Sequence, residues 1–401
     1  MAMSLPSYRW VMLAMAFLIT FTQHLLLFSY APMIPRVILE MEMTNAQAFS
    51  IFSACILTLA IFRIPWGLLC DHAGIRISAG LAVTLMGVFG LLRGFAFDFW
   101  TLLVLQMFLG IGFSATMPCL PKIVAGWFRQ ESGFATGIYV AGFSIGNMCG
   151  LGLTPYMLKW LGDWRNVFYT YGVWAMLLAV LWWIIAREPR KSETKSRGRI
   201  GAAVSLKETF SAAIRIKEVW ILAGLFLCTV GCYDTISTLL PYFFELRGMD
   251  PLTAGFIASM LPLGFLVASL SVGALSDWVG LRKPFMWSLG ILSSLAILVV
   301  GIASDITLWA VTFIIGFSLM GILTLVLAIP TELPNATPYV ASIVGILSSV
   351  GNAGTLVLPV ATGYLKDVTG SFLPAIIMLA TVEGATVIMG LVLRETGTKR
   401  H

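Results

Sequence analysis

Four ionisable side chains lie deep inside long apolar runs of this 401-residue sequence: His24, Arg63, Asp234 and Glu383. A charged side chain at the centre of a lipid bilayer costs roughly 2.5–3.5 kcal/mol on insertion scales. Such residues therefore pair with one another or serve the passage of ions and solutes. The arginine is suited to anion binding, and the histidine and carboxylates are suited to proton exchange.

Arg63 lies near the middle of the second apolar run, in the stretch AIFRIPWGLLCD. Its guanidinium can donate a forked pair of hydrogen bonds to a small planar oxyanion or to a carboxylate. A single arginine suits a monovalent anion or an amphiphile with one carboxylate. The alternative is a structural Arg63, paired with an acid such as Asp234 or with a backbone carbonyl.

Asp234 lies equally deep in the seventh apolar run and follows Tyr233 in GCYDTISTLLPYF. A carboxylate at this depth can carry a coupling proton or hold a cationic substrate. The Tyr233 ring can contact an ammonium group through a cation–π interaction. Because adjacent residues of a helix point about 100° apart, only one of the two is expected to face a cavity fully.

Three neutral polar residues in apolar runs are further candidates for ligand contact: Gln106, Asn147 and Asn352. The two asparagines can hydrogen-bond a ligand, or they can bridge helices, which is the usual role of asparagine in membrane packing. His24 is a candidate proton relay, with a hydrogen-bonded core histidine as the alternative. Glu383 is a weaker candidate for proton handling.

Composition places these residues in a membrane protein. Hydrophobic residues make up 59% of the chain and charged residues 11%, against about 25% charged in a soluble domain. The mean hydropathy is +0.92, which excludes a water-soluble fold. The net charge of +6 is spread over short loops, so no nucleic-acid partner is expected.

Neither a cofactor nor an enzyme activity is indicated by the motifs. The six cysteines form no CxxC pair, and no cluster of cysteine and histidine is present, so we expect no metal site and no disulfide framework. HExxH and GxxxxGK[ST] are both absent. ATP is therefore not the expected energy source.

The apolar runs predict an all-α integral membrane protein with twelve transmembrane helices, since a bilayer-crossing helix needs about 20 mostly apolar residues. The first run is too long for the apolar core of a signal peptide. The predicted spans are 9–33, 48–70, 77–97, 100–124, 133–158, 166–186, 218–244, 253–275, 285–303, 307–328, 340–365 and 372–393.

The longest polar interruption predicts two six-helix halves, 1–186 and 218–401, joined by a basic linker over 187–217. With both termini inside, eighteen Lys and Arg residues fall on the inner side and six on the outer side. The positive-inside rule therefore predicts cytoplasmic termini and a cytoplasmic linker. Short loops and a compact chain are typical of a prokaryotic plasma (inner) membrane protein, expected as a monomer.

The two halves repeat one another. The loop GLLCDHAGIR after the second span recurs 206 residues later as GALSDWVGLR, and SIGN (144–147) recurs as SVGN (349–352). Two matches at nearly one offset indicate internal duplication. The repeated loop residues are Gly67, Asp71, Gly74 and Arg76 in the first copy and Gly273, Asp277, Gly280 and Arg282 in the second.

With twelve spans, this repeated loop and Gly-rich fifth and eleventh spans, the chain resembles the major facilitator superfamily of secondary transporters. The resemblance implies a cavity between the halves that opens alternately to each side, with the loop residues acting as gating residues. In that family the loop aspartate, here Asp71, meets the eleventh helix and holds the cytoplasmic side shut. We expect Gly74 to permit the tight turn and Arg76 to contact an acid or a phospholipid.

Two positions refine this resemblance. The stretch around Arg63 is similar to the second span of the nitrate/nitrite porters, but the position of their second arginine is Ser269 here. Gln106 occupies the place where many members of the superfamily carry an arginine. The loss of that charge argues against the drug exporters that exchange protons through it.

Together these features predict a secondary active transporter of a small organic or inorganic anion. It would work by alternating access and be driven by a proton or by exchange for another anion. Arg63 would bind the anion, and Asp234 or His24 would take the proton. One alternative is a carrier of an organic cation or zwitterion that uses Asp234. Another is a non-transporting sensor or assembly protein on the same fold.

Overall fold

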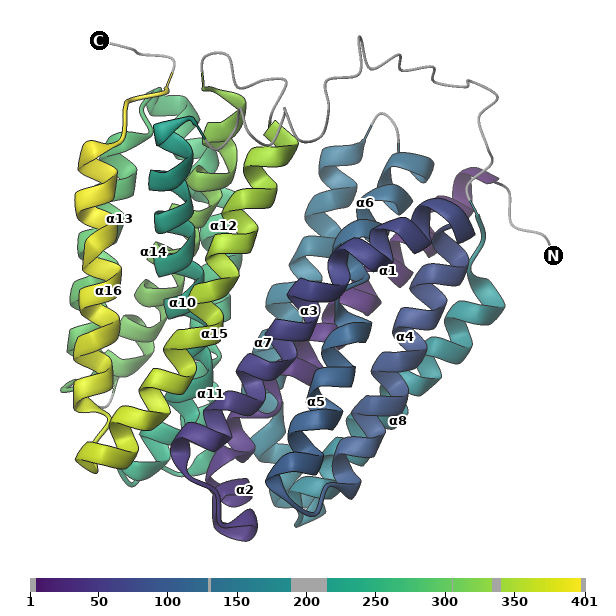
Figure 1. Ribbon diagram of the computed structural model, residues 1–401, viewed down its shortest axis with the longest axis horizontal. Helices are drawn as coiled ribbons and strands as arrows, with labels where there is room; N and C mark the ends of the chain where they lie inside the picture. Colours follow the sequence, from purple (N-terminus) through teal and green to yellow (C-terminus); the bar gives the residue numbers. More distant parts are fainter. Residues whose placement is uncertain (1–4, 129–130, 189–214, 305, 334–339, 398–401) are drawn as a thin grey trace. The chain divides into compact units, whose positions relative to one another are not determined.

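Helices form nearly all of the secondary structure in this computed structural model, which describes residues 5–128, 131–188, 215–304, 306–333 and 340–397 (Figure 1). Within these ranges twelve helical segments are long and apolar enough to cross a membrane. The predicted all-α membrane fold is therefore confirmed, since in lipid every backbone polar group must be satisfied inside the helix.

The first six spans are built from ten helical elements. They are α1 (Leu5–Phe28), η1 (Ala31–Met33), α2 (Ile34–Met41), α3 (Asn45–Ala73), α4 (Ile75–Leu92), η2 (Arg93–Phe95), α5 (Phe99–Phe113), α6 (Thr116–Trp127), α7 (Ser132–Leu161) and α8 (Trp164–Ile185).

The remaining spans are built from eight helical elements within the described part of the chain. They are α10 (Lys217–Leu246), α11 (Pro251–Ala258), α12 (Met260–Val279), α13 (Lys283–Val300), α14 (Ile306–Ala328), η3 (Ile329–Thr331), α15 (Val340–Thr369) and α16 (Leu373–Val392). Most of the predicted linker lies outside the described residues.

The first span extends further than the apolar pattern predicts. α1 ends at Phe28, and the chain then continues through η1 into α2, which ends at Met41 rather than near residue 33. Prolines favour these helix starts, because a proline in the first turn forfeits no helical hydrogen bond. Glu42 then adopts a left-handed conformation (φ 50°) and closes α2. α2 is amphipathic, and its buried face escapes a count of apolar residues.

Packing divides the chain into two units that differ from the sequence halves. Unit 1 contains residues 1–190 and 237–262, and unit 2 contains residues 191–236 and 263–401. The end of α10, α11 and the start of α12 thus pack with the first six spans. The predicted halves follow the internal duplication of the sequence, whereas the two units group the segments that pack together.

Glycines set the closest helix contacts inside each unit. On α7, a Cβ at Gly142 would lie 2.1 Å from Thr20 Oγ1 of α1, and one at Gly146 would lie 2.3 Å from the Phe21 carbonyl oxygen. In unit 2, a Cβ on Gly354 of α15 would lie 2.3 Å from the Leu227 carbonyl of α10. The Gly-rich fifth and eleventh spans are therefore packing faces, as small residues at membrane helix interfaces usually are.

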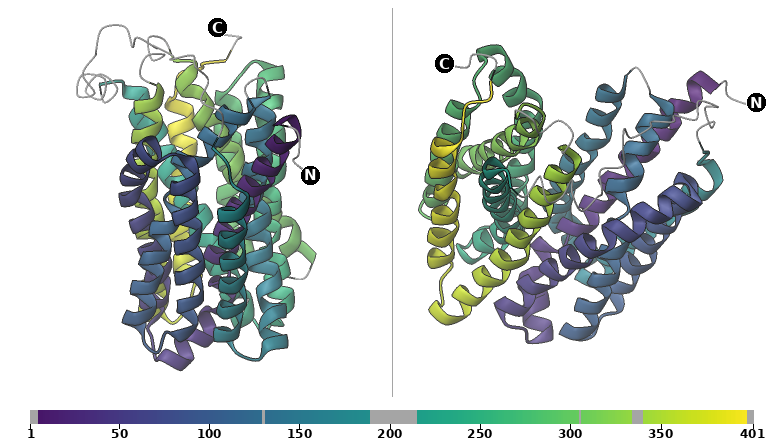
Figure 2. Two further views of the ribbon diagram at one scale, coloured as in Figure 1. Left: turned by 90° about the vertical axis from the view of Figure 1, so that its right-hand side faces the viewer. Right: turned by 45° about the horizontal axis from the view of Figure 1, so that its top comes forward.

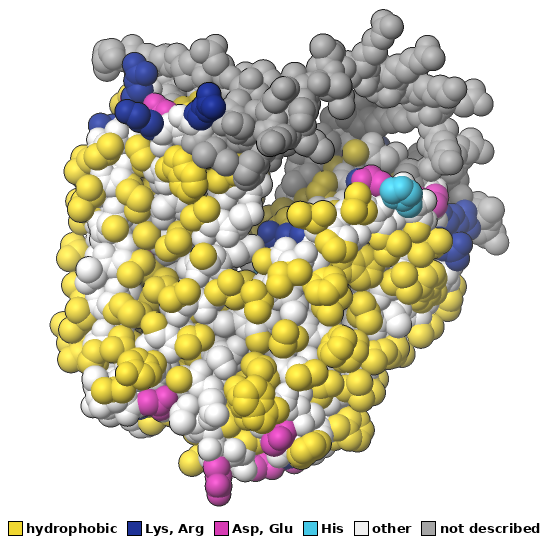
Figure 3. All heavy atoms as spheres, viewed as in Figure 1, with side chains coloured by type: hydrophobic (Ala, Val, Ile, Leu, Met, Phe, Trp, Pro, Cys, Tyr) yellow, Lys and Arg dark blue, Asp and Glu magenta, His cyan; other side chains and the backbone are white. Residues whose placement is uncertain are grey.

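The helices of each unit run side by side (Figure 2). On the face shown in Figure 3, hydrophobic side chains cover the middle of each unit, and Asp and Glu side chains lie toward its ends. Large apolar side chains such as Ile64 and Trp278 are exposed by 74% and 83%. Exposure of this kind is expected of a surface that faces lipid rather than water.

Candidate functional site

Arg63 projects from the middle of α3, in a segment held firmly against α5. One turn or so to either side, Thr58 Oγ1 donates to the Met107 carbonyl (2.7 Å) and Trp66 Nε1 donates to the Ile111 carbonyl (2.8 Å). The Arg63 side chain is half-buried, and its Nε is buried without a hydrogen-bond partner among the described residues. α3 thus presents a positioned guanidinium that none of those residues neutralises.

His24 lies on α1 and packs among aromatic rings. Its ring centroid is 4.6 Å from that of Phe143 on α7 and 5.9 Å from that of Phe28. Asn147, one turn beyond Phe143 on α7, is buried. His24 therefore lies at the α1–α7 interface, where its ring contacts Phe143.

Gln106 is fully buried on α5 and serves a partner that the sequence analysis missed. Its Oε1 accepts a hydrogen bond from Arg93 Nη1 (3.3 Å), which also donates to the Leu26 carbonyl (3.0 Å). The Arg93 guanidinium stacks 4.3 Å from the ring centroid of Phe168 and is fully buried. Arg93 therefore binds the end of α1, where carbonyls lack helical partners. Its place at the edge of an apolar run is typical of a loop charge, so no sequence signal distinguished it.

The adjacent residues Tyr233 and Asp234 have different surroundings in unit 2. Tyr233 is buried, and its ring packs edge-on against Phe265 with centroids 5.8 Å apart. Asp234 is half-buried, and its Oδ2 accepts a hydrogen bond from Thr355 Oγ1 of α15 (3.0 Å). Asn352 is half-buried one turn before Thr355. Asp234 thus lies at the α10–α15 contact, three residues before α10 passes into unit 1.

Glu383 is fully buried where α16 packs on α13. Its Oε1 accepts hydrogen bonds from Ser293 Oγ (3.0 Å) and Thr386 Oγ1 (3.4 Å). Its Oε2 is buried without a hydrogen-bond partner among the described residues. The carboxyl joins two neighbouring helices of unit 2.

The first copy of the repeated loop makes its contacts inside unit 1. Gly74 has φ 84°, a left-handed conformation that glycine adopts without strain, so the expected tight turn is present. Asp71 forms an ion pair with Lys122 of α6. The Arg76 guanidinium donates to the Trp183 carbonyl (3.0 Å), and an acid, Glu188, accepts from its backbone N–H (2.6 Å).

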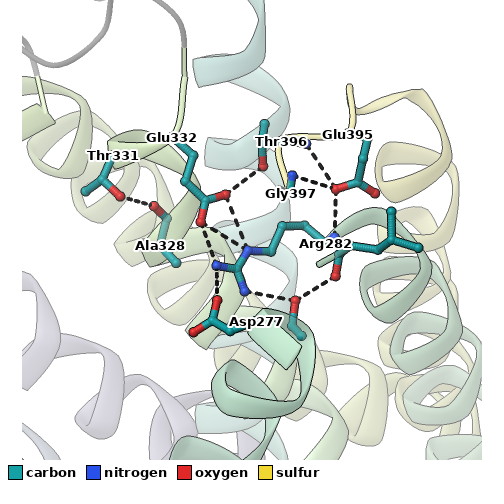
Figure 4. A network of polar contacts seen from close by, with 10 residues as sticks. Asp277, Arg282, Ala328, Thr331, Glu332, Glu395, Thr396 and Gly397 are labelled. Atoms are coloured by element: carbon teal, nitrogen blue, oxygen red, sulfur yellow. Dashed lines mark hydrogen bonds and ion pairs between the residues drawn. The ribbon is translucent and has the colours of Figure 1, made fainter. Parts of the chain in front are cut away.

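The second copy centres on Arg282, which lies between two carboxylates (Figure 4). Arg282 Nη2 contacts Asp277 and also Glu332 Oε1 (2.6 Å), while its Nε donates to the same Glu332 oxygen (3.1 Å). The hydrogen bond to Glu332, opposed by burial and aided by Asp277, raises the pKa of Arg282 above its usual value. Gly280 repeats the left-handed turn with φ 76°.

A carboxylate caps the helix that follows each repeated loop: Glu188 in the first copy and Glu395 in the second. The sequence analysis did not identify these two residues. Glu395 Oε1 accepts from the Arg282 N–H (2.7 Å) and its Oε2 from the Lys283 N–H (3.0 Å), at the start of α13. Glu188 does the same for Arg76 at the start of α4. The signal was present, because Arg-Glu at 187–188 recurs at 394–395, an offset of 207 residues. Acids stabilise helix N-termini through the exposed N–H groups and the helix dipole.

The family is shown by a family model described as Major Facilitator Superfamily, which matches residues 16–359. The chain therefore belongs to the major facilitator superfamily, whose members are membrane transporters rather than enzymes. The resemblance inferred from the loops and the spans is confirmed.

Relatives with assigned substrates match along most of their length. A probable galactarate/D-glucarate transporter of Bacillus subtilis is 25% identical, over 96% of this chain and 92% of its own. The sialic acid transporter of Escherichia coli K12 is 25% identical, over 82% and 81%. A D-galactonate transporter of Escherichia coli O6:H1 is 24% identical, over 86% and 85%.

A solved structure supports the fold. The bacterial homologue of the human lysosomal transporter Spinster superposes with a TM-score of 0.77 at 18% identity, covering 96% of this chain and 95% of the other. At this identity the likeness concerns the fold alone.

Proposed function

We propose that this protein is a secondary active transporter of a small organic carboxylate anion, with Arg63 as the residue that binds the carboxylate. The observation that carries the proposal is Arg63 in mid-span on α3, where Thr58 and Trp66 hold the helix against α5 and the guanidinium forms no ion pair with a described residue. A partly buried cation without a fixed counter-charge is costly, and a transported anion would supply that charge.

The relatives support a carboxylate over an inorganic anion. Glucarate, galactonate and sialic acid, named for three of them, are all carboxylates of sugar acids. A guanidinium binds a carboxylate through two parallel hydrogen bonds, and a lysine cannot reproduce that fork. Charge alone is therefore insufficient for the site we propose.

Coupling is assigned to a proton carried by Asp234. Its carboxylate is half-buried, is hydrogen-bonded by Thr355 and lies beside the point where α10 leaves unit 2. His24 is the second candidate. The protein would lie in the plasma membrane as a monomer with both termini in the cytoplasm, as the charge distribution predicts.

The test is thermal stabilisation of the detergent-purified protein, because a ligand that binds the folded state raises its melting temperature. Sugar acids, simple carboxylates, nitrate and quaternary amines are screened against the parent. We expect a carboxylate to stabilise the parent and Arg63→Gln to abolish the shift. Arg63→Lys should weaken binding about tenfold or more, since it keeps the charge but loses the fork.

The matched control is Arg9→Gln, which removes a cation of unit 1 that is already paired with Glu131 at 3.2 Å. It should retain the ligand shift. If amines alone stabilise the parent and Asp234→Asn removes that effect, the protein is a cation carrier and Arg63 is structural. If Arg9→Gln loses the shift as fully as Arg63→Gln, the assignment to Arg63 fails.

A further inference from the structure

The end of unit 1 that carries α2 is built from segments far apart in sequence. Arg36 of α2 forms an ion pair with Glu245 near the end of α10 (3.3 Å). α11 packs on α7 so closely that a Cβ on Gly255 would lie 2.6 Å from the Leu151 carbonyl oxygen. The positive-inside prediction places this end on the outer face of the membrane.

A groove lies at this end, directly beside Arg36, and encloses about 440 Å³. Pro155 and Leu158 of α7 and Pro251 of α11 form apolar walls, and its charged lining residues are Arg36, Lys159 and Asp250. Sites for small organic ligands commonly enclose roughly 300–1,000 Å³ and combine apolar walls with a few polar groups. The groove is therefore of the size of a small organic molecule.

The lining residues of the groove include two cations, Arg36 and Lys159, and one carboxylate, Asp250. Asp250 caps the start of α11, where its Oδ2 accepts a hydrogen bond from the Leu252 N–H (3.1 Å). Lys159 forms no ion pair with any described residue. Arg36 uses a single nitrogen, Nη1, for the Pro32 carbonyl (3.2 Å) and for both oxygens of Glu245 (3.3 Å each).

The contact between Arg36 and Glu245 is a loose one. Charge-assisted N–H···O hydrogen bonds usually measure about 2.7–2.9 Å, and the favoured arrangement uses two nitrogens. Here one nitrogen contacts both oxygens at 3.3 Å, and about a third of the Arg36 side chain is exposed. The Nε and Nη2 atoms of Arg36 form no hydrogen bond with a described residue, so the guanidinium keeps donors for a second carboxylate.

We propose that this groove is a second, superficial anion-binding site, in which Arg36 and Lys159 capture a carboxylate that competes with Glu245 for Arg36. It deepens the proposed function, on which it rests, because its ligand is the same carboxylate before that ligand reaches Arg63. Glu245 competes with the ligand for Arg36. When the ligand displaces Glu245, the ion pair between α2 and α10 breaks.

The experiment measures carboxylate uptake in right-side-out and inverted membrane vesicles. Arg36→Gln and Lys159→Gln should raise the half-saturating concentration about three- to tenfold from the groove side only, as expected for the loss of a partly exposed charge contact. The maximal rate should stay unchanged. Glu245→Gln should lower the half-saturating concentration from the same side, because the competitor is gone.

The matched control is Arg165→Gln, at an ion pair with Glu40 at the same end of unit 1 but outside the groove. It should leave uptake unchanged. Lys159 is exposed, so we expect its variant to fold as the parent does. Equal effects from both faces, or a changed maximal rate with an unchanged half-saturating concentration, would overturn the capture site.

The two proposals fail in different ways. If the parent transports no carboxylate, the proposed function fails and the capture site with it. Alternatively, the parent transports a carboxylate and Arg63→Gln abolishes that uptake. If Arg36→Gln and Lys159→Gln then show the same half-saturating concentration as Arg165→Gln, only the capture site fails.

Discussion

At the scale of single residues, what distinguishes the charged groups is whether a partner compensates them. Arg282 has two carboxylates, and Arg93 has a helix end and an aromatic ring. Arg63 has no such compensation among the described residues. A compensated charge holds helices together, whereas an uncompensated one is available to a ligand. This difference, rather than depth in the membrane, separates the candidate site from the structural charges.

Glu395 gives a pH-dependent prediction at this scale. Burial raises the pKa of its carboxyl, but hydrogen bonds from the N–H groups of Arg282, Gly397, Lys283 and Thr396 outweigh burial and leave the pKa below its ordinary value. A lowered pKa in the folded state means that the ionised carboxylate stabilises the fold above the ordinary pKa of about 4.3. That stabilisation is lost as the pH falls through the lowered value.

Glu395→Gln should therefore lower the free energy of unfolding by about 1 kcal/mol at neutral pH, the usual size of a helix-cap contribution. The difference from the parent should stay constant above about pH 4.3 and shrink only as the pH falls below that value, through the lowered pKa of Glu395. Thermal unfolding at several pH values measures it, with Glu42→Gln as an exposed control. A constant difference across the range would show that the charge of Glu395 is not what stabilises α13.

At the scale of elements, glycine decides which helices can meet. Gly146→Ala should destabilise the protein by about 1–3 kcal/mol, because its Cβ would lie 2.3 Å from a backbone oxygen of α1 that cannot move independently. Gly137→Ala, on the same helix with nothing within 4 Å of the added atom, should be neutral or stabilise by up to about 1 kcal/mol. Thermal unfolding in detergent compares them, and equal melting temperatures would contradict the close-packing role.

At the scale of the whole molecule, the charge distribution predicts which face of the membrane each end of unit 1 occupies. Glu42 follows α2, and His72 lies at the far end of α3. With the six native cysteines replaced by serine, Glu42→Cys should react with an impermeant maleimide added to intact cells, and His72→Cys should react only after the cells are opened. The reverse pattern would invert the topology and move the proposed capture site to the cytoplasmic face.

The sequence by itself determined the class of fold, the spans and the internal duplication. These follow from local properties, because a helix in lipid needs only enough consecutive apolar residues and a repeated turn needs only its glycines. The sequence did not predict α2, which follows α1 and ends at Met41. α2 is amphipathic, and which of its faces is buried depends on the helices that pack against it.

Tertiary structure alone decided what each polar residue contacts. Gln106 and Arg93 are 13 residues apart and belong to one buried cluster, whereas Arg36 and Glu245 are 209 residues apart and form an ion pair. Sequence spacing can place residues on one helix face, but it cannot tell which faces of different helices meet. For the same reason the sequence identified Arg63 as a charge within the membrane, and the fold showed that no described residue neutralises it.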